Sequence, residues 1–103
     1  ADPTANYNYA IRYSSEKGHT DVVDLLLKDG RADPAEYDNW AIQEASKNGH
    51  VDVVVLLLED CRTDPTSNDN WSIQKAYENG HADVVDLLLK DGRADLTQCI
   101  FQM

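Results

Sequence analysis

The stretch Gly18-His19-Thr20-Asp21-Val22-Val23-Asp24-Leu25-Leu26-Leu27 determines the architecture, because it occurs three times in the chain with small changes. The other copies run from Gly49 to Leu58 and from Gly80 to Leu89, so successive copies are 31 residues apart. A fixed period of this length indicates a repeat protein. The chain is therefore one structural unit written three times. Pairs of aspartate and proline keep the same interval, at Asp2-Pro3, Asp33-Pro34 and Asp64-Pro65.

The repeated stretch predicts a helix that buries one face. Its apolar residues fall at i, i+1, i+4 and i+5, which is the spacing of a stripe along a helix. A buried β-strand is the alternative for such an apolar run. In the other two copies, however, Asp24 and Asp86 replace Val55. The face opposite the apolar stripe is therefore polar at helical spacing, which favours a helix over a strand. The expected core stripe of the second copy is Val53, Val54, Leu57 and Leu58.

Each unit also contains a shorter predicted helix before this stretch. Between Asn39 and Asn48 apolar residues are set among good helix formers, and the segment stops at Gly49, a residue typical of helix C-termini. One helix pair of this size cannot bury its own apolar face, so neighbouring pairs must stack and share a core. The expected fold is all-α, a solenoid of about three helix–loop–helix repeats with short inter-repeat loops.

The length of 103 residues, with 42% hydrophobic content, provides material for one compact unit. We expect a single domain over residues 1–103, with repeats at 1–31, 32–62 and 63–93. The remaining segment, 94–103, departs from the repeat before a fourth unit could form. We interpret it as a partial repeat or a C-terminal cap, in which Ile100 and Phe101 cover the last repeat. A truncation from a longer array is the alternative.

The repeated stretch resembles the second-helix signature of ankyrin repeats, Gly-His-x-Glu/Asp-Val-Val-x-Leu-Leu-Leu, and the resemblance covers nearly the whole chain. The interval is shorter than the usual ~33 residues. The usual Thr-Pro-Leu-His opening of the first helix is replaced, for example by Trp40-Ala41-Ile42-Gln43. In these features the chain is similar to divergent ankyrin repeats of large DNA viruses and amoebal proteins. The resemblance implies a shortened inter-repeat finger, with Asp38-Asn39 or Asp69-Asn70 as a replacement N-cap.

The charge of the chain limits the class of partner. There are 19 acidic against 9 basic residues, a formal charge of −10, which repels nucleic-acid phosphate and favours a basic protein partner. No apolar run reaches the ~18–20 residues needed to cross a bilayer, so no membrane partner is expected. Cys61 and Cys99 are too few for a disulfide-built secreted scaffold and fit free thiols in a reducing compartment. We therefore expect a cytoplasmic, intracellular protein.

No pattern in the sequence predicts catalysis or a cofactor. One histidine per unit invites a zinc interpretation, but stacked helices lie ~8–10 Å apart, whereas zinc needs imidazole nitrogens ~2 Å from one ion. The ankyrin resemblance implies a structural role for these residues, in the turn before the second helix. Converging carboxylate pairs, phosphate loops and nucleophile–histidine sets are missing. We expect no enzyme activity, no cofactor and no metal. The three histidines are His19, His50 and His81.

Positions that differ between the repeats are the candidate partner contacts, because structural positions are forced to agree. By resemblance, the loop tips and the inner face of the first helix form the concave recognition surface of ankyrin proteins. Tyr37 is an aromatic residue at an otherwise polar tip, a type that anchors interfaces, although a merely solvated loop is the alternative. The aromatics Tyr9, Trp40 and Trp71 are interpreted as inter-repeat packing, with a binding stripe as the alternative. The predicted contacts are Asn6, Arg12, Glu36, Tyr37, Asp38, Gln43, Asn68, Asp69 and Gln74.

These features favour a monomeric, non-enzymatic protein–protein interaction module. Its partner is expected to be a protein with basic or polar groups, held through the concave face and the loop tips. The alternative is a targeting or regulatory segment of a larger enzyme or effector protein.

Overall fold

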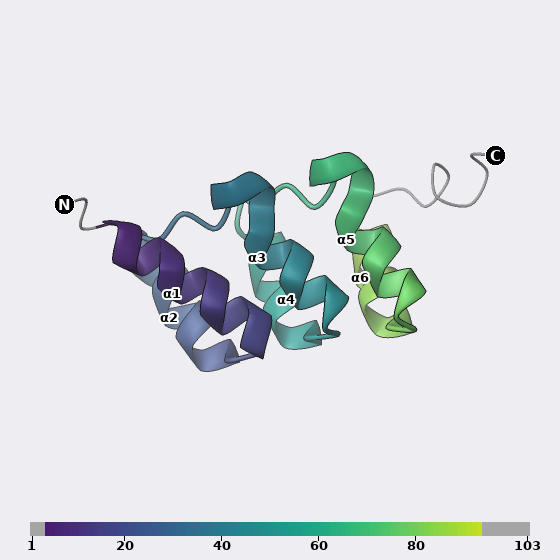
Figure 1. Ribbon diagram of the computed structural model, residues 1–103, viewed down its shortest axis with the longest axis horizontal. Helices are drawn as coiled ribbons and strands as arrows, with labels where there is room; N and C mark the ends of the chain where they lie inside the picture. Colours follow the sequence, from purple (N-terminus) through teal and green to yellow (C-terminus); the bar gives the residue numbers. More distant parts are fainter. Residues whose placement is uncertain (1–3, 94–103) are drawn as a thin grey trace.

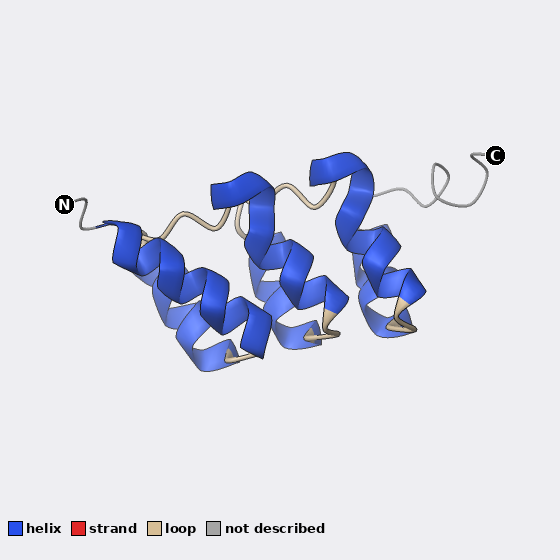
Figure 2. Cartoon of the chain, in the orientation of Figure 1, coloured by secondary structure: helices blue, strands red, loops and turns tan. Residues whose placement is uncertain are grey.

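The computed structural model of the protein describes residues 4–93, which form helices and no strand. Figure 1 shows three helix pairs side by side in chain order, and Figure 2 shows the short loops between them. The all-α expectation is confirmed. The expected cap at 94–103 lies outside the described residues. No helix in residues 4–93 is long and apolar enough to cross a membrane. The helices are α1 (Thr4–Lys17), α2 (Thr20–Asp29), α3 (Glu36–Lys47), α4 (Val51–Glu59), α5 (Ser67–Glu78) and α6 (Ala82–Asp91).

The helices form two layers. Helices α1, α3 and α5 pack against one another in one layer, and α2, α4 and α6 pack behind them in the other (Figure 1). Within each repeat the two helices are antiparallel and contact each other. Each helix therefore touches its partner in the same repeat and its counterpart in the next, which is the arrangement of a linear solenoid.

A glycine turn closes each helix pair. Gly49 has a φ of 75°, and Gly18 and Gly80 both have a φ of 78°, a left-handed conformation that glycine adopts without steric cost. The amide of His50 then donates to the carbonyl of Ala45 at 2.9 Å, which satisfies an otherwise unpaired helix-end carbonyl. The predicted glycine end of the first helix is confirmed.

The predicted core stripe is also confirmed. Val53, Val54 and Leu57 have no exposed surface, and Leu58 is half-buried. Ile42 of α3 is equally enclosed and joins the same core. Burying a side chain of this size stabilises the fold by about 2 kcal/mol. The core therefore runs between the two helix layers.

Equivalent residues show that the core is continuous from repeat to repeat. Val53 and Val84 are fully buried, but Val22, at the same position of the first repeat, is 41% exposed. At the other end, Leu89 is exposed whereas its counterpart Leu58 is half-buried. Each repeat covers its neighbour, and the core opens at both ends of the described stack.

The starts of α3 and α5 differ from the expectation. Residues 37–39 and 68–70 all have φ values between 55° and 64°, so each first helix opens with a left-handed turn. The corresponding residues 6–8 lie inside the continuous helix α1. The helices do not begin at the predicted N-caps Asp38-Asn39 and Asp69-Asn70: Ala35 and Thr66 hold the N-cap positions, and neither makes a side-chain cap hydrogen bond. Asn39 is instead buried and accepts a hydrogen bond from the amide of Asp64 at 2.7 Å.

Cys61 occupies the position of Gly30 and Gly92, where a left-handed backbone is expected. Both glycines have a φ of 89°, but Cys61 has no such conformation. Helix α4 ends at Glu59, and Asp60 follows with extended dihedrals of −88° and 122°. This different loop path avoids the cost of about 1 kcal/mol that a side chain would carry in the left-handed region.

Candidate protein-binding edge

The stack has two long edges of different character. The Gly-His turns between paired helices lie along one edge, and the inter-repeat loops with the starts of α3 and α5 lie along the other (Figure 1). We call the first, made by residues 18–19, 49–50 and 80–81, the hairpin edge. We call the second, made by the turns 36–39 and 67–70 and the side chains that contact them, the loop edge. Eight of the nine predicted contact residues lie on the loop edge, and Asn6 does not.

The first turn of the loop edge is held by the first repeat. Arg12 of α1 forms an ion pair with Glu36, and its guanidinium lies 4.4 Å from the ring centroid of Tyr37. The amide of Asn8 also donates to Glu36, at 2.8 Å. Tyr37 remains 67% exposed. The structure therefore brings three predicted residues together and presents an aromatic ring to solvent.

The second turn is joined to the first. The side-chain amide of Gln43 donates to the carbonyl of Asp38 at 2.5 Å, and Asn68 donates to the Gln43 side-chain oxygen at 3.3 Å. Gln74 repeats the first of these contacts by donating to the Asp69 carbonyl at 2.7 Å. Gln43 is only 6% exposed, so it braces the turns and presents no free amide. The carboxylates of Asp38 and Asp69 stay exposed.

Asn6 is the ninth predicted residue and stands apart from this network in the sequence, near the start of α1. Its side chain is exposed. It occupies the repeat position of Tyr37 and Asn68, but in α1 that position lies in a regular helix. The loop edge proper is therefore built by the second and third repeats, with Arg12 as the contribution of the first.

A row of asparagines supports the loop edge, a role that was not predicted from the sequence. Asn8 accepts a hydrogen bond from the amide of Asp33 at 2.6 Å, as Asn39 does from Asp64. Asn70 is buried at the same repeat position. The signal was present, since these asparagines recur at the repeat interval, but Asn39 was interpreted as a helix cap.

Arginine side chains link successive loops. Arg62 forms an ion pair with Asp60 and donates to the carbonyl of Ala32 in the preceding loop at 2.8 Å. Arg93 makes the same bridge to Thr63, at 3.0 Å. The hydrogen bond from Arg62 holds the pKa of Asp60 below its ordinary value of 3.8. These arginines were not predicted, although they also recur at the repeat interval.

The excess of acid is not neutralised inside the protein. Lys17 lies 5.8 Å from the ring centroid of Tyr13. The other eight basic residues each pair with an acidic side chain, and none of these ion pairs includes Asp38 or Asp69. The loop edge therefore keeps the negative charge of Asp38 and Asp69. The paired basic residues are Arg12, Lys28, Arg31, Lys47, Arg62, Lys75, Lys90 and Arg93.

The hairpin edge is closed by histidines. The ring of His50 lies against Gly18, where an added Cβ would sit 2.7 Å from Nδ1, and His81 lies against Gly49 in the same way. The Nε2 atom of His50 is 2.8 Å from the carbonyl oxygen of Glu16. These rings therefore pack repeats together. Within residues 4–93, no three potential metal ligands lie close enough to hold an ion.

The aromatic residues that open the first helices are only partly packed. Trp40 and Trp71 are half-buried, and the ammonium of Lys75 lies 5.7 Å from the Trp71 ring centroid. Tyr9 is 61% exposed and stacks on Tyr13, with ring centroids 6.1 Å apart. The packing interpretation therefore suits the two tryptophans better than Tyr9.

The fold and the loop edge together define a helical-repeat protein whose repeats are interlocked on one edge and variable on the other. A family model described as ankyrin repeats (3 copies) matches residues 1–69. The chain therefore belongs to the ankyrin repeat family, whose members are generally protein-binding modules. Comparison with curated proteins finds no match. The matched range ends inside α5, but the same turns and inter-repeat contacts continue to residue 93.

Proposed function

We propose that the protein is a monomeric, non-enzymatic module of a single domain, which holds a protein partner with basic groups along its loop edge. The loop edge is continuous over two inter-repeat turns. It is braced from beneath by buried side chains, and it offers an aromatic ring together with unneutralised carboxylates.

Tyr37 carries this proposal. A bulky residue with a positive φ is an outlier, because its Cβ crowds the backbone, whereas asparagine tolerates this region. The other two repeats have Asn6 and Asn68 at this position. The second repeat thus keeps a tyrosine where the local backbone disfavours one, and Arg12 supports its ring. Strained residues of this kind cluster at binding sites.

Charge supports the class of partner. Asp38 and Asp69 stay exposed in equivalent left-handed turns of neighbouring repeats, and eight of the nine basic side chains already pair with other acidic residues. An arginine or lysine of a partner can pair with these carboxylates and stack on the outer face of Tyr37. Such contacts raise the association rate and weaken as salt is added.

Peptide display on the immobilised full chain tests the proposal. We expect selected peptides to be rich in arginine and lysine and to lose affinity as ionic strength rises. The double variant Asp38→Asn/Asp69→Asn should reduce their binding by about tenfold or more. The matched control is Asp52→Asn/Asp83→Asn, which removes the same charge from the starts of α4 and α6 and should leave binding nearly unchanged. Equal losses in both variants, or binding indifferent to salt, would contradict a loop-edge site.

The variant Tyr37→Asn separates binding from folding. It gives the second repeat the asparagine of the other two, so the fold should keep or gain stability. The selected peptides should nevertheless bind more weakly, because the stacking ring is gone. Unchanged binding in a stably folded Tyr37→Asn protein would remove Tyr37 from the site.

Two finer assignments follow from the same observations. We propose that the repeats are of the divergent type found in large DNA viruses and amoebal proteins, which the 31-residue interval supports. We also propose an intracellular, cytoplasmic location, which the exposed free thiol of Cys61 supports. Fractionation of cells that express the full chain, followed by thiol labelling, checks the location.

A further inference from the structure

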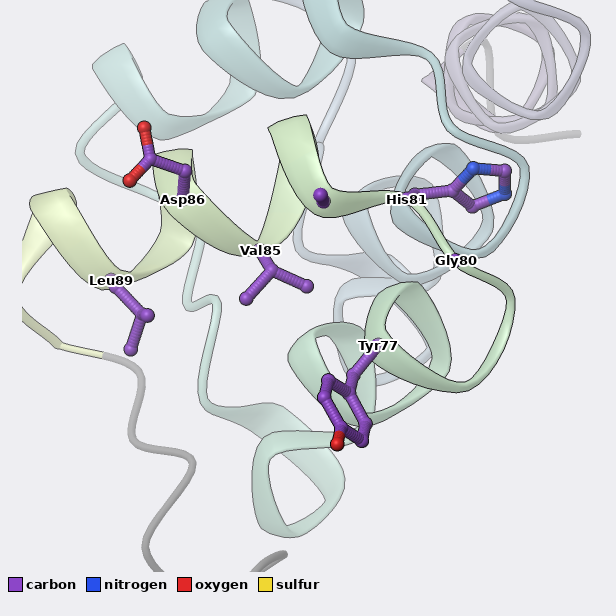
Figure 3. Close-up of a pocket in the computed structure, with 7 residues that line it drawn as sticks. Tyr77, Gly80, His81, Val85, Asp86 and Leu89 are labelled. Atoms are coloured by element: carbon purple, nitrogen blue, oxygen red, sulfur yellow. The ribbon is translucent and has the colours of Figure 1, made fainter.

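The C-terminal end of the stack carries an apolar depression that no described residue covers. It has a volume of about 440 Å³ and is lined mainly by Tyr77 of α5, Gly80, and Val85 and Leu89 of α6. Figure 3 shows the ring of Tyr77 and the methyl groups of Val85 and Leu89 around it, with the ring of His81 turned away. Tyr77 is 58% exposed and Leu89 is 44% exposed. We call this surface the end face.

Inside the stack, the following repeat closes the same positions. Val54 is fully buried, whereas Val85 at the same repeat position is only half-buried. An added Cβ on Gly49 would meet the His81 ring at 2.6 Å, but one on Gly80 would meet no atom of the described residues within 4 Å. The end face is therefore an unfilled repeat boundary.

Tyr77 makes this boundary unlike the other two. The equivalent residues of the first and second repeats are Ser15 and Ser46, and both have no exposed surface. A tyrosine ring has no room where a following helix pair encloses a serine so completely. A further repeat, from this chain or from a second copy, therefore cannot stack on Tyr77 as the third repeat stacks on Ser46. The end face fits a thinner occupant than a helix pair.

We propose that this occupant is the chain's own segment 94–103, which lays Leu96, Ile100 and Phe101 over Tyr77, Val85 and Leu89. From Leu96 onward the segment carries no charge, in a chain whose formal charge is −10. It follows α6 directly, after Arg93. Its ten residues can span up to ~33 Å. That exceeds the ~15 Å length of a helix such as α6. The segment thus has the composition and the reach to run back along α6.

Paramagnetic relaxation in the full chain tests this arrangement. Cys99 lies within the segment, and a nitroxide label on it becomes unique after Cys61→Gly, the residue that the other two repeats have at this position. We expect the amide signals of Val85 and Leu89 to lose more than half their intensity. The signals of Val22 and Leu25, at the far end of the stack, should be unaffected and serve as the internal control. No loss at the end face, or equal loss at both ends, would overturn the proposal.

Two further measurements decide who the occupant is. In the first, isotope-labelled chains without the nitroxide are mixed with unlabelled chains that carry it. Broadening of Val85 and Leu89 in that mixture would assign the end face to a second copy and overturn the intramolecular arrangement. In the second, Ile100→Ser/Phe101→Ser in the nitroxide-labelled chain should weaken the broadening of Val85, which lies farther along α6 from Arg93 than Leu89 does, while the dispersion of the amide spectrum is kept. Broadening of Val85 as strong as in the parent would also overturn the proposal.

Discussion

The two edges of the stack differ in how far the three repeats resemble one another. On the hairpin edge, the Gly-His pair is the same in every repeat, and the rings of His50 and His81 fill the space over the glycine of the preceding repeat. On the loop edge, the backbone turns of the second and third repeats are nearly identical, but the side chains differ and Tyr37 stands in solvent. The hairpin edge thus holds the repeats together, and the loop edge displays what distinguishes them. Uniformity in a repeat protein marks structure, whereas a difference on a fixed backbone marks a candidate contact.

Gly49→Ala should have the largest effect, because it attacks the interlocked hairpin edge. The new Cβ would lie 2.6 Å from the His81 ring, at a residue with a φ of 75°. Strain and overpacking together should lower the free energy of unfolding by about 3 kcal/mol. Gly80→Ala is the matched control, since its φ is 78° but its Cβ would meet no residue of the described range 4–93, and it should cost about 1 kcal/mol. Urea unfolding of the two variants measures the difference. Equal losses would show that the histidine contact does not hold the repeats together.

Asn39→Gly tests the support beneath the loop edge. Glycine keeps the left-handed backbone but removes the side-chain oxygen that accepts from the Asp64 amide. We expect a loss of about 1–2 kcal/mol, the usual effect of breaking a largely buried hydrogen bond. Asp38→Gly, in the same turn with its carboxylate exposed, should be nearly neutral. A neutral result for Asn39→Gly would mean that this hydrogen bond does not stabilise the loop edge.

Tyr37→Asn should change stability less than Asn39→Gly does, and it should raise stability where Asn39→Gly lowers it. Relief of the left-handed tyrosine favours the variant by about 1 kcal/mol, and loss of the Arg12 stacking removes about half of that gain. We expect a melting temperature equal to or slightly above that of the parent. A clear fall in melting temperature would show that the ring serves packing and not display.

The smallest expected effect is a change in acid sensitivity at the inter-repeat bridge. Because Arg62 lowers the pKa of Asp60 in the folded state, their pairing stabilises the fold above the unfolded pKa of ~3.9. That contribution is lost as the pH falls through the lower folded pKa. Arg62→Gln should therefore flatten the decline of melting temperature below about pH 4. Arg31→Gln is the comparison, because Arg31 makes the equivalent ion pair with Asp29 at the end of the first repeat and also lowers its pKa, so it should change the acid curve in the same direction. Parallel acid curves for the parent and Arg62→Gln would contradict this account.

The helix pairs and their core could be predicted from the sequence, because their signals are local and repeated three times. The stripe at Val53, Val54 and Leu57 follows from helical spacing alone, and the ends of the first helices follow from glycine. The placement of the turns could not be predicted in the same way. Asn39 has the composition of a helix cap, yet its side chain bonds to the backbone of the next loop, a contact 25 residues away in sequence.

The candidate site was predictable as a region but not as a set of roles. Differences between the repeats pointed to Arg12, Glu36 and Tyr37, which the structure brings into contact. The same criterion also selected Gln43, whose amide proves to be enclosed and engaged. Variation in sequence does not distinguish a side chain that faces a partner from one that adjusts the turn beneath it. That distinction depends on burial, which only the folded stack determines.

The arginine bridges have a consequence for how the stack opens. Arg62 and Arg93 each reach back to the preceding inter-repeat loop, Arg93 also to the Leu58 carbonyl of α4, and the helix layers likewise pack neighbour to neighbour. Cooperativity should therefore spread along the stack in single steps, with the terminal repeats fraying first and the amides of α3 and α4 exchanging most slowly. A ligand that contacts the turns of both the second and the third repeat would couple the opening of these two repeats. Slower hydrogen exchange in α5 and α6 would then report its binding.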